Sequence, residues 1–371
     1  MNLRSKPIRD ADGWVSMVPK SSRVMRPQST LEAFDAICAK VKRGEKWVDP
    51  NPPAWSKDHV TKKLPLKWVS PREAFGEGVE IAMYKRTPGN KADAAVVAFS
   101  DPKQGDVGNC WFISALAMIA KASPATIERA LTRSNEALGV YEFTFYDETL
   151  RGVVRVCVDE RLPVHAEEGC VVYCVSETAG ELWPSLIEKA FAKAYGSYTI
   201  TESGSNAIGV CNLTRRPYTA YLAYYNQKLM RDASKLWAKL VGAYNARNAI
   251  GVSFVQQARE PYFPLDVNPG SGYSWHVRNH QPRNIVSGHA YSVLSVHEVV
   301  DGARKVRLVR IRNPWGRRGE WLGDWSDNSS KWTARLKAQV PFSELGDEDG
   351  VFFMSVEDLA RNVECVGVCG Y

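Results

Sequence analysis

The sequence predicts an α+β fold of two subdomains, with a mainly helical first half and a second half built on antiparallel β-strands. Two observations carry this prediction. The chain has 371 residues, which is too long for one ordinary hydrophobic core. Apolar residues recur at helical spacing in the first half, whereas β-branched and aromatic runs dominate the second. The pattern changes within residues 214–235, and we divide the chain into 1–46, 47–225 and 226–371.

The first 46 residues are expected to form an N-terminal extension. Residues 1–28 carry Pro, Ser and Arg without periodicity, which is typical of a mobile segment. Residues 29–32 read Ser-Thr-Leu-Glu, a capping-box pattern. A helix is therefore predicted to start there and to end before Gly44.

The segment 47–225 is predicted to combine helices with a few strands. An apolar helix is expected to begin at or near Cys110. Residues 140–146 and 153–158 alternate or run β-branched and aromatic, which favours two strands. A helix is predicted over about 183–196, because a proline follows its first residue and a glycine stands at its end.

The segment 226–371 is predicted to be β-rich. A Tyr-rich stretch at about 218–244 is expected to be helical and to lead into it. The pair Asp301-Gly302 is a strong hairpin signal between two apolar runs. Strands are expected at 251–255, 288–300, 305–312 and 351–355.

The composition is that of a globular protein and argues against two classes of partner. The net charge is +7, but Lys and Arg form no dense run interleaved with aromatics, so we expect no nucleic-acid binding. No apolar run is long enough for a transmembrane segment, and the N-terminus lacks a signal-peptide pattern. The eight scattered cysteines favour free thiols in a reducing, cytoplasmic setting.

Residues 104–120, QGDVGNCWFISALAMIA, contain the candidate nucleophile. A thiol at a helix N-terminus feels the positive end of the helix dipole, which favours the thiolate of Cys110. Gln104 carries a side-chain amide that can donate a hydrogen bond to a developing oxyanion. Taken alone, this stretch favours a buried structural cysteine, because most cysteines are inert.

A second pattern supplies the groups that a cysteine nucleophile needs. His289 lies 12 residues before Asp301 and Asn313 lies 12 residues after it. A hairpin around Asp301 would place the two residues opposite one another, within cross-strand reach. An asparagine amide can then fix the imidazole tautomer so that the other ring nitrogen faces the thiol. Singly, a core histidine and an Asn-Pro turn are the more common interpretations, but the agreement of the two favours catalysis.

These motifs together resemble the protease core of the calpain family, intracellular cysteine proteases with a papain-like fold. Residues 104–111 are similar to the nucleophile motif of the family, 288–292 to its histidine motif and 312–316 to its asparagine motif. The resemblance covers the chain from about Trp47 to the C-terminus. Further matching stretches are 158–163, 183–198, 320–327 and 352–355.

The resemblance implies catalytic roles for four residues. Cys110 would be the nucleophile, His289 the general base and acid, and Asn313 the group that orients His289. The Gln104 side chain and the Cys110 backbone N–H would form the oxyanion hole. The implied activity is calcium-dependent, limited proteolysis by an endopeptidase whose active site lies in the cleft between the two subdomains.

Three further positions would meet the protein substrate. Gly204 and Gly288 correspond to the backbone that holds the residue before the scissile bond. Trp315 corresponds to an aromatic residue that sits between the subdomains and moves when the cleft closes. Regulatory domains or subunits are possible partners, although this sequence does not encode them.

The resemblance also implies one or two Ca²⁺ ions, because the family core has one calcium site in each subdomain. Asp101 and Glu181 match the side-chain ligands of the first site. For the second site, the matching residues are Glu320, Asp327 and Asp349.

The sequence departs from the family pattern in two places. A further acidic ligand of the second calcium site falls at Val351, and 317–319 bring two arginines that would oppose a cation. These features speak against the second site. Asn109 stands where the family usually has Asp, which removes a charge beside the nucleophile. We expect altered tuning of the thiol rather than loss of activity.

Two other functions compete with proteolysis. A calpain-like regulator would bind partners without cleaving them, and the intact triad residues speak against it. A transglutaminase-type acyltransferase shares a Cys-Trp motif and a Cys/His pair. Those enzymes orient the histidine with Asp, whereas this chain has Asn313.

Overall fold

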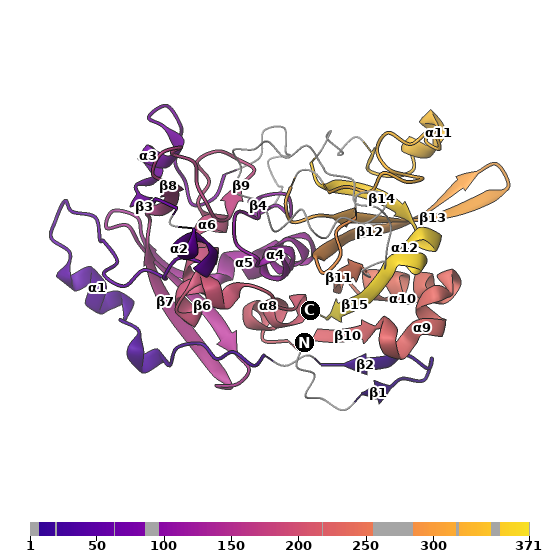
Figure 1. Ribbon diagram of the computed structural model, residues 1–371, viewed down its shortest axis with the longest axis horizontal. Helices are drawn as coiled ribbons and strands as arrows, with labels where there is room; N and C mark the ends of the chain where they lie inside the picture. The colour runs from indigo at the N-terminus through magenta and orange to yellow at the C-terminus, as the bar shows by residue number, and fades with distance from the viewer. Residues whose placement is uncertain are drawn as a thin grey trace.

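The computed structural model describes residues 7–18, 21–62, 64–85, 96–216, 218–254, 285–316, 319–342 and 349–370. It has the predicted α+β fold. Helices and small sheets form its first half, and a large antiparallel sheet forms most of its second half (Figure 1). Within the described residues, no helix is both long and apolar enough to cross a membrane.

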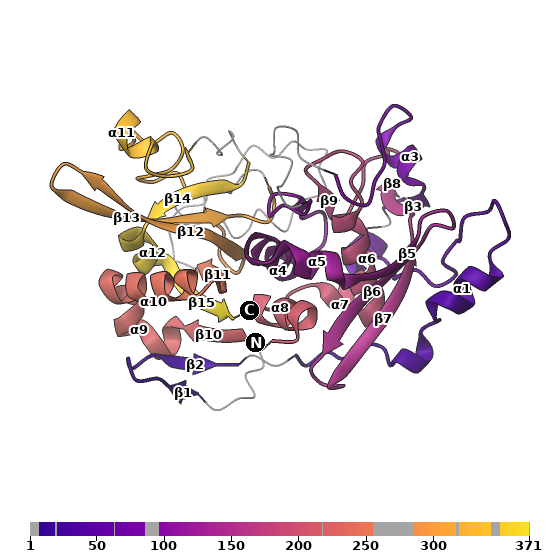
Figure 2. The ribbon, with the colours of Figure 1, turned by 180° about the vertical axis from the view of Figure 1, so that it is seen from behind.

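Helix α4 (Cys110–Ala122) lies at the centre of the molecule, between the two halves (Figures 1 and 2). Every side chain over 111–120 is buried, because this segment is apolar on nearly all sides. On one side, Phe112 stacks on Phe191 of α6 (Trp183–Tyr195), with ring centroids 3.7 Å apart. On the other, the Ser114 hydroxyl is 3.0 Å from the Ser292 hydroxyl of the large sheet. The helix therefore belongs to both halves.

The remaining elements of the first half are short helices and small sheets. The three-stranded sheet comprises β5 (Leu131–Asn135), β6 (Val140–Asp147) and β7 (Gly152–Asp159). Two strand pairs are β3 (Leu66–Val69) with β8 (Leu162–His165), and β4 (Pro102–Lys103) with β9 (Val175–Ser176). The helices are η1 (Gln28–Thr30), α1 (Phe34–Lys40), α2 (Lys57–Thr61), α3 (Pro71–Phe75), α5 (Pro124–Ala130), α7 (Tyr198–Thr201) and α8 (Asn206–Thr214).

Several predictions for this half are confirmed. Strands β6 and β7 cover the two β-runs predicted at 140–146 and 153–158. Helix α6 starts at Trp183, with proline in its first turn, and ends at Gly196. Gly196 adopts φ 105°, the left-handed conformation that ends many helices.

The large sheet has eight antiparallel strands and a helical layer. In spatial order the strands are β1 (Ile8–Arg9), β2 (Val15–Met17), β10 (Tyr218–Leu222), β15 (Val363–Cys369), β11 (Ala249–Phe254), β12 (Ala290–Asp301), β13 (Arg304–Arg312) and β14 (Val351–Ser355). Helices α9 (Ala223–Arg231), α10 (Ala233–Asn245) and α12 (Val356–Asn362) pack on one face and form a second apolar core with it. The short helix α11 (Ala334–Lys337) contributes to a smaller cluster around Trp332.

Two predictions for the N-terminal region are wrong. Residues 8–17 are not a separate mobile segment, because β2 pairs with β10 and Trp14 is buried in the second core. This burial offsets the entropy lost when the segment is ordered. The helix predicted from 29–32 starts later. Residues 28–30 form the 3-10 turn η1 directly after Pro27. Helix α1 begins only at Phe34, and no side chain caps its N-terminus.

The Tyr-rich stretch at 218–244 begins as a strand rather than a helix. In β10, Tyr218 and Ala220 are buried while their neighbours are less so, the alternation expected of a strand. The Tyr218 side chain packs directly on the backbone of Gly367 in the paired strand β15. A Cβ atom at position 367 would lie 1.7 Å from the Tyr218 hydroxyl, so this packing requires glycine. Strand β10 precedes the boundary predicted at 225, yet it belongs to the large sheet.

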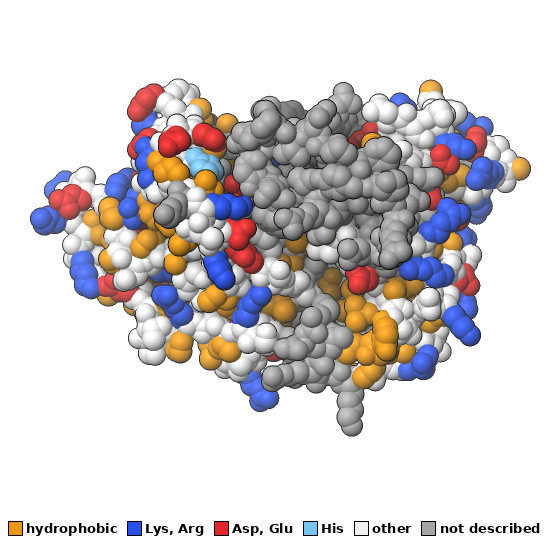
Figure 3. Space-filling model, in the orientation of Figure 1, with side chains coloured by type: hydrophobic (Ala, Val, Ile, Leu, Met, Phe, Trp, Pro, Cys, Tyr) orange, Lys and Arg blue, Asp and Glu red, His pale blue; other side chains and the backbone are white. Residues whose placement is uncertain are grey.

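Charged side chains are mixed in sign on the visible surface. On the face drawn in Figure 3, the Lys and Arg side chains of the described residues are scattered among Asp and Glu rather than gathered into one basic field. One pair of charges lies in the interior. Lys189 and Asp159 are both fully buried and form a salt bridge.

We expect the substitution Asp159→Ala to lower the free energy of unfolding by about 3–5 kcal/mol, because it leaves the Lys189 ammonium buried without its partner. The matched control is Lys40→Ala, which breaks a solvent-exposed salt bridge with Glu32 and should cost less than about 1 kcal/mol. Urea denaturation of both variants measures the difference. Equal effects would contradict this account of the core.

Candidate active site

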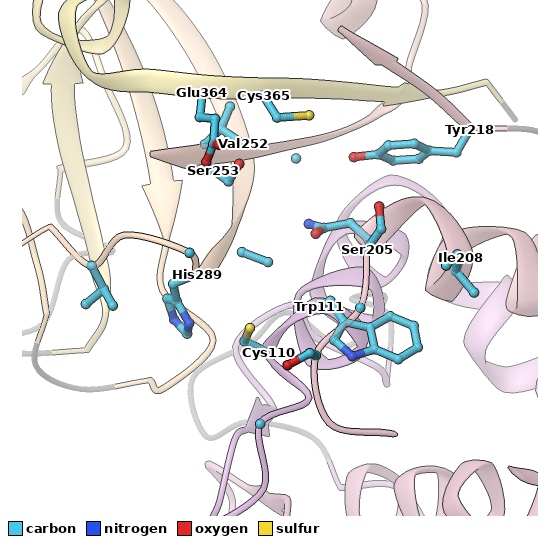
Figure 4. A pocket seen from close by; sticks show the side chains of 18 of the residues that line it. Cys110, Trp111, Ser205, Ile208, Tyr218, Val252, Ser253, His289, Glu364 and Cys365 are labelled. Carbon is cyan, nitrogen blue, oxygen red and sulfur yellow. The ribbon is translucent and has the colours of Figure 1, made fainter. Parts of the chain in front are cut away.

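A cleft of about 760 Å³ opens between the start of α4 and the large sheet, where residues of β11, of β15 and of the segment before β12 line it (Figure 4). Cys110 and His289 lie on its walls, one at the start of α4 and the other just before β12. The predicted site residues among those that line the cleft are Gln104, Cys110, Gly204, Gly288, His289 and Trp315.

Cys110 is the first residue of α4, as predicted, and it remains partly exposed. The preceding loop is fixed by backbone hydrogen bonds. The Asn109 N–H donates to the Val107 carbonyl at 2.8 Å, and the Asn109 carbonyl accepts from Phe112 N–H at 2.8 Å. The Ala290 N–H, next to His289, donates toward the Cys110 sulfur. The thiol therefore faces the histidine side of the cleft.

His289 and Asn313 are held together by a hydrogen bond of 2.8 Å between Nε2 and Oδ1. Asn313 is fully buried, and its amide orientation is set by two backbone groups. Oδ1 also accepts from the Trp315 N–H at 3.0 Å, and Nδ2 donates to the Gly319 carbonyl at 3.2 Å. Because Oδ1 only accepts, Nε2 of His289 must donate, which leaves Nδ1 as the basic nitrogen.

The route to this contact differs from the predicted one. The hairpin does turn beside Asp301, but Asp301 pairs with Arg304, and the ladder ends with Ser292 opposite Arg312. The register also shifts between Val293 and Ser295. His289 and Asn313 are therefore not a directly opposed pair. Both lie just beyond the paired residues, where their side chains reach each other.

Gln104 lies in the loop before α4, and backbone contacts with both halves fix its position. Its N–H donates to the Pro314 carbonyl at 2.9 Å, and its Nε2 donates to the Val107 carbonyl at 2.8 Å. This contact uses one of the two Nε2 hydrogens, since a side-chain amide carries two. The loop passes so close to Val172 that a Cβ atom on Gly105 would lie 2.3 Å from the Val172 carbonyl oxygen, so only glycine fits there.

The three predicted substrate contacts line the same cleft. The Trp315 ring lies against the His289 ring, with centroids 4.7 Å apart. The Gly204 backbone passes over the Trp111 indole, where a Cβ atom would be 2.3 Å from a ring carbon. Gly288 is exposed and adopts φ +62°. Gly204 and Gly288 thus leave exposed backbone beside the candidate nucleophile and base.

The candidate nucleophile and base are both neutral at pH 7 in this conformation. Burial raises the pKa of Cys110 to about 11. The backbone N–H groups of Ala290, Trp111 and Cys110 lower this pKa, but by less than burial raises it. Burial lowers the pKa of His289 to about 4, and the hydrogen bond with Asn313 opposes this shift. The helix N-terminus does favour the thiolate, as predicted, since the Trp111 and Cys110 N–H groups lower the pKa, but desolvation outweighs this effect.

Two of the predicted calcium ligands, Asp101 and Glu181, lie close together. Burial and, after it, the negative charge of Glu181 raise the pKa of Asp101 to about 7. Asp101 Oδ2 accepts from the Ala98 N–H at 2.7 Å, and Glu181 Oε1 accepts from the Lys85 N–H at 2.7 Å. Two buried carboxylates that repel each other are a donor set that suits a hard cation. The residues present therefore fit the first site.

The second predicted calcium site is less complete. Glu320 Oε1 accepts from the Gly350 N–H at 2.6 Å, which places it beside Asp349. Asp327 lies in the turn that follows Trp325. The Arg312 guanidinium interacts electrostatically with both Asp101 and Asp349, so a positive charge already lies near each predicted site. Across the described residues, no three His, Cys, Asp or Glu side chains are arranged to hold a metal ion. Residues 317–318, where the arginines were expected to oppose a cation, lie outside the described residues.

Arg312 and Glu188 are buried charges near the site to which the sequence analysis gave no role. The Arg312 guanidinium donates from Nη2 to the carbonyls of Ser100 at 3.0 Å and Pro102 at 2.9 Å, and so joins the two halves. Glu188 Oε1 accepts from Asn109 Nδ2 at 2.6 Å, directly before Cys110. Both residues lie inside matched motifs, at 312–316 and 183–198, but their partners are distant in sequence.

Comparison with known proteins gives one consistent result. The sequence profile described as calpain family cysteine protease matches residues 56–370. The chain is 34% identical over 272 residues to the calpain-type cysteine protease DEK1 of Arabidopsis thaliana, a match that covers 73% of this chain and 11% of that protein. It is 28% identical over 366 residues to calpain-14 of Homo sapiens, covering 95% of this chain and 47% of that protein. It is 27% identical over 365 residues to calpain-A of Drosophila melanogaster, covering 94% of this chain and 39% of that protein. The chain thus spans less than half the length of each of these relatives, and it belongs to the calpain family of cysteine proteases.

Proposed function

We propose that this chain is an endopeptidase that cleaves protein substrates by limited proteolysis through Cys110, His289 and Asn313. The observation that carries the proposal is the hydrogen bond between His289 Nε2 and Asn313 Oδ1 at the edge of a cleft that also holds the Cys110 thiol. A histidine in the required tautomer and a thiol at a helix N-terminus are the two groups from which an activated cysteine nucleophile is built.

The proposed reaction is acyl transfer to the thiol, followed by hydrolysis. His289 Nδ1 takes the proton of the Cys110 thiol while the sulfur attacks the scissile carbonyl carbon. The negative charge that develops on the carbonyl oxygen is stabilised by the Cys110 N–H and the Gln104 side-chain amide. His289 then gives its proton to the leaving amine, and afterwards activates the water that releases the acyl group. Asn313 keeps the imidazole oriented throughout.

The cleft suits an extended polypeptide chain. The exposed backbone of Gly204 and Gly288 would hold the residue before the scissile bond, and Trp315 would move as the cleft closes. The proposed subdomains, 47–225 and 226–371, would move relative to one another in that step. We place the enzyme in the cytoplasm, with protein substrates and with regulatory domains or subunits as further partners.

Calcium is the proposed activator. Asp101 and Glu181 would hold one ion, and its charge would offset the repulsion between these two buried carboxylates. Glu320, Asp327 and Asp349 would supply a second, weaker site, which Val351 and the nearby Arg312 guanidinium oppose. Asp101 of the first proposed site stands between Ser100 and Pro102, whose carbonyls accept from Arg312. Arg312 in turn directly precedes Asn313, which would connect this site to the catalytic residues.

We expect the wild type to cleave unfolded casein with millimolar calcium and not with chelator, and Cys110→Ala to cleave it in neither condition. Cleavage by the variant would overturn the role of Cys110. Wild-type cleavage in both conditions would keep the protease and discard the calcium switch. A folded wild type that never cleaves would favour a non-proteolytic binding protein.

A second prediction follows from the pKa of Cys110 and concerns the calcium-free protein, kept in chelator. A thiol with a pKa of about 11 is protonated at neutral pH, so its alkylation by iodoacetamide should rise about tenfold for each pH unit between 7 and 9. Mass spectrometry of the Cys110 peptide measures the rate, with the exposed Cys170 as internal control. A rate that is constant between pH 6 and 8 would instead show a thiolate–imidazolium pair.

A further inference from the structure

Glu188 is a buried carboxylate without a cation. It lies on α6 with only 1% of its surface exposed, and within the described part of the chain it forms no ion pair with Lys or Arg. Its neighbour Lys189, also buried, is paired with Asp159. An unpaired buried carboxylate is unfavourable for folding. Stability alone therefore does not explain why a carboxylate stands at this position.

Both carboxylate oxygens of Glu188 bind groups close to the candidate active site. Oε1 accepts from Asn109 Nδ2 at 2.6 Å, and Asn109 is the residue before Cys110. Oε2 accepts from the Cys174 N–H at 2.8 Å. Asn109 is itself fully buried, and its side chain does not cap α4. The contact with Glu188 therefore replaces the usual side-chain cap as the restraint on this residue.

The Cys174 segment in turn supports the loop that carries Gln104. The Asp106 N–H donates to the Val172 carbonyl at 2.8 Å, and Lys103 pairs with Val175 in the β4–β9 ladder. Gln104 lies between these two contacts. One carboxylate thus holds the backbone on both sides of the oxyanion hole: Asn109 on the side of the Cys110 N–H, and Cys174 on the side of the Gln104 amide.

We propose that Glu188 is the positioning residue of the oxyanion hole, which fixes the distance between the Cys110 N–H and the Gln104 amide through its hydrogen bonds to Asn109 and Cys174. The proposal rests on the proteolytic function proposed above. Glu188 does not touch the reacting atoms. It acts through the two backbone segments, and a misplacement of about 1 Å in such a donor can lower the rate about 100-fold.

Ionisation of Glu188 is part of this role. Burial raises the pKa of Glu188 to about 7, while the hydrogen bonds from Asn109 and Cys174 lower it. The ionised carboxylate accepts from both donors, but protonation turns one oxygen into a donor that faces an N–H group. The two contacts are therefore strongest above about pH 7 and weaken as the pH falls below it. The ionisable groups near Glu188 are Tyr173, Cys174 and Tyr198, and the Glu188 charge raises their pKa values.

A glutamine at this position can restore both contacts without a charge. The Asn109 Oδ1 atom is buried and has no hydrogen-bond partner among the described residues. If the Asn109 amide flips, its Oδ1 atom can accept a hydrogen bond from the NH2 group of the introduced glutamine. The carbonyl oxygen of that glutamine can then accept from the Cys174 N–H. Glu188→Gln is therefore the conservative variant, and Glu188→Ala removes both contacts.

The test compares kcat and KM of the wild type, Glu188→Ala and Glu188→Gln on a fluorogenic peptide with calcium, from pH 6 to 9. Glu188→Ala should lower kcat about 10- to 100-fold and leave KM within about twofold. Glu188→Gln should keep kcat within about threefold at pH 8, lose the decline near pH 7 and unfold at the same or a higher temperature. The control variant is Glu142→Ala, because Glu142 on β6 is also a buried carboxylate. It should leave kcat unchanged.

Three results would overturn the proposal: a folded Glu188→Ala with wild-type kcat, a Glu188→Gln variant as impaired as Glu188→Ala, or an equal loss in Glu142→Ala. If the wild type itself shows no Cys110-dependent cleavage, the proposed function fails separately. Alkylation of Cys110 then provides the readout. A shifted pH profile in Glu188→Ala would support the positioning role, and an unchanged profile would refute it.

Discussion

The burial of α4 in a hydrophobic core to which both the first half and the large sheet contribute is the constraint on which the site depends. Its first-half side is fixed by aromatic stacking of Phe112 on Phe191, and its other side meets the large sheet through Ser114 and Ser292. The approach is so close that a Cβ atom on Gly251 would lie 3.0 Å from the Met118 sulfur. Because α4 cannot move without disturbing its packing on both sides within this core, Cys110 at its N-terminus is held opposite the strand that follows His289.

The same burial sets the electrostatic state of the site. Desolvation favours the neutral forms of Cys110 and His289, and it raises the pKa values of Asp101 and Glu188 to about 7. The resting site is therefore a thiol and an imidazole rather than an ion pair. A protease with this resting state needs a rearrangement to activate the thiol. The two repelling carboxylates beside the Arg312 contacts are our proposed site for the activating cation.

Motifs with local signals were predictable from the sequence, and contacts between distant segments were not. The helix that starts at Cys110 and the length of α6 follow from local periodicity and capping residues. The contact of His289 with Asn313 was predicted, but from a hairpin register that differs from the observed one. The strands near Trp14 depend on β10, more than 200 residues away. The hairpin register was not predicted, because no residue pattern in the sequence indicates the shift between Val293 and Ser295. The thiol pKa and the Glu188 contacts depend on burial, which periodicity does not report.

The central claim is that the cleft presents Cys110 as a nucleophile activated by His289. The most direct measurement is mass-spectrometric mapping of the adduct formed with a peptidyl epoxide in the presence of calcium. The account predicts one rapid adduct, on Cys110, that His289→Ala slows by orders of magnitude while the exposed Cys170 reacts slowly in both proteins. Preferential labelling of Cys170, or labelling of Cys110 that does not depend on His289, would contradict it.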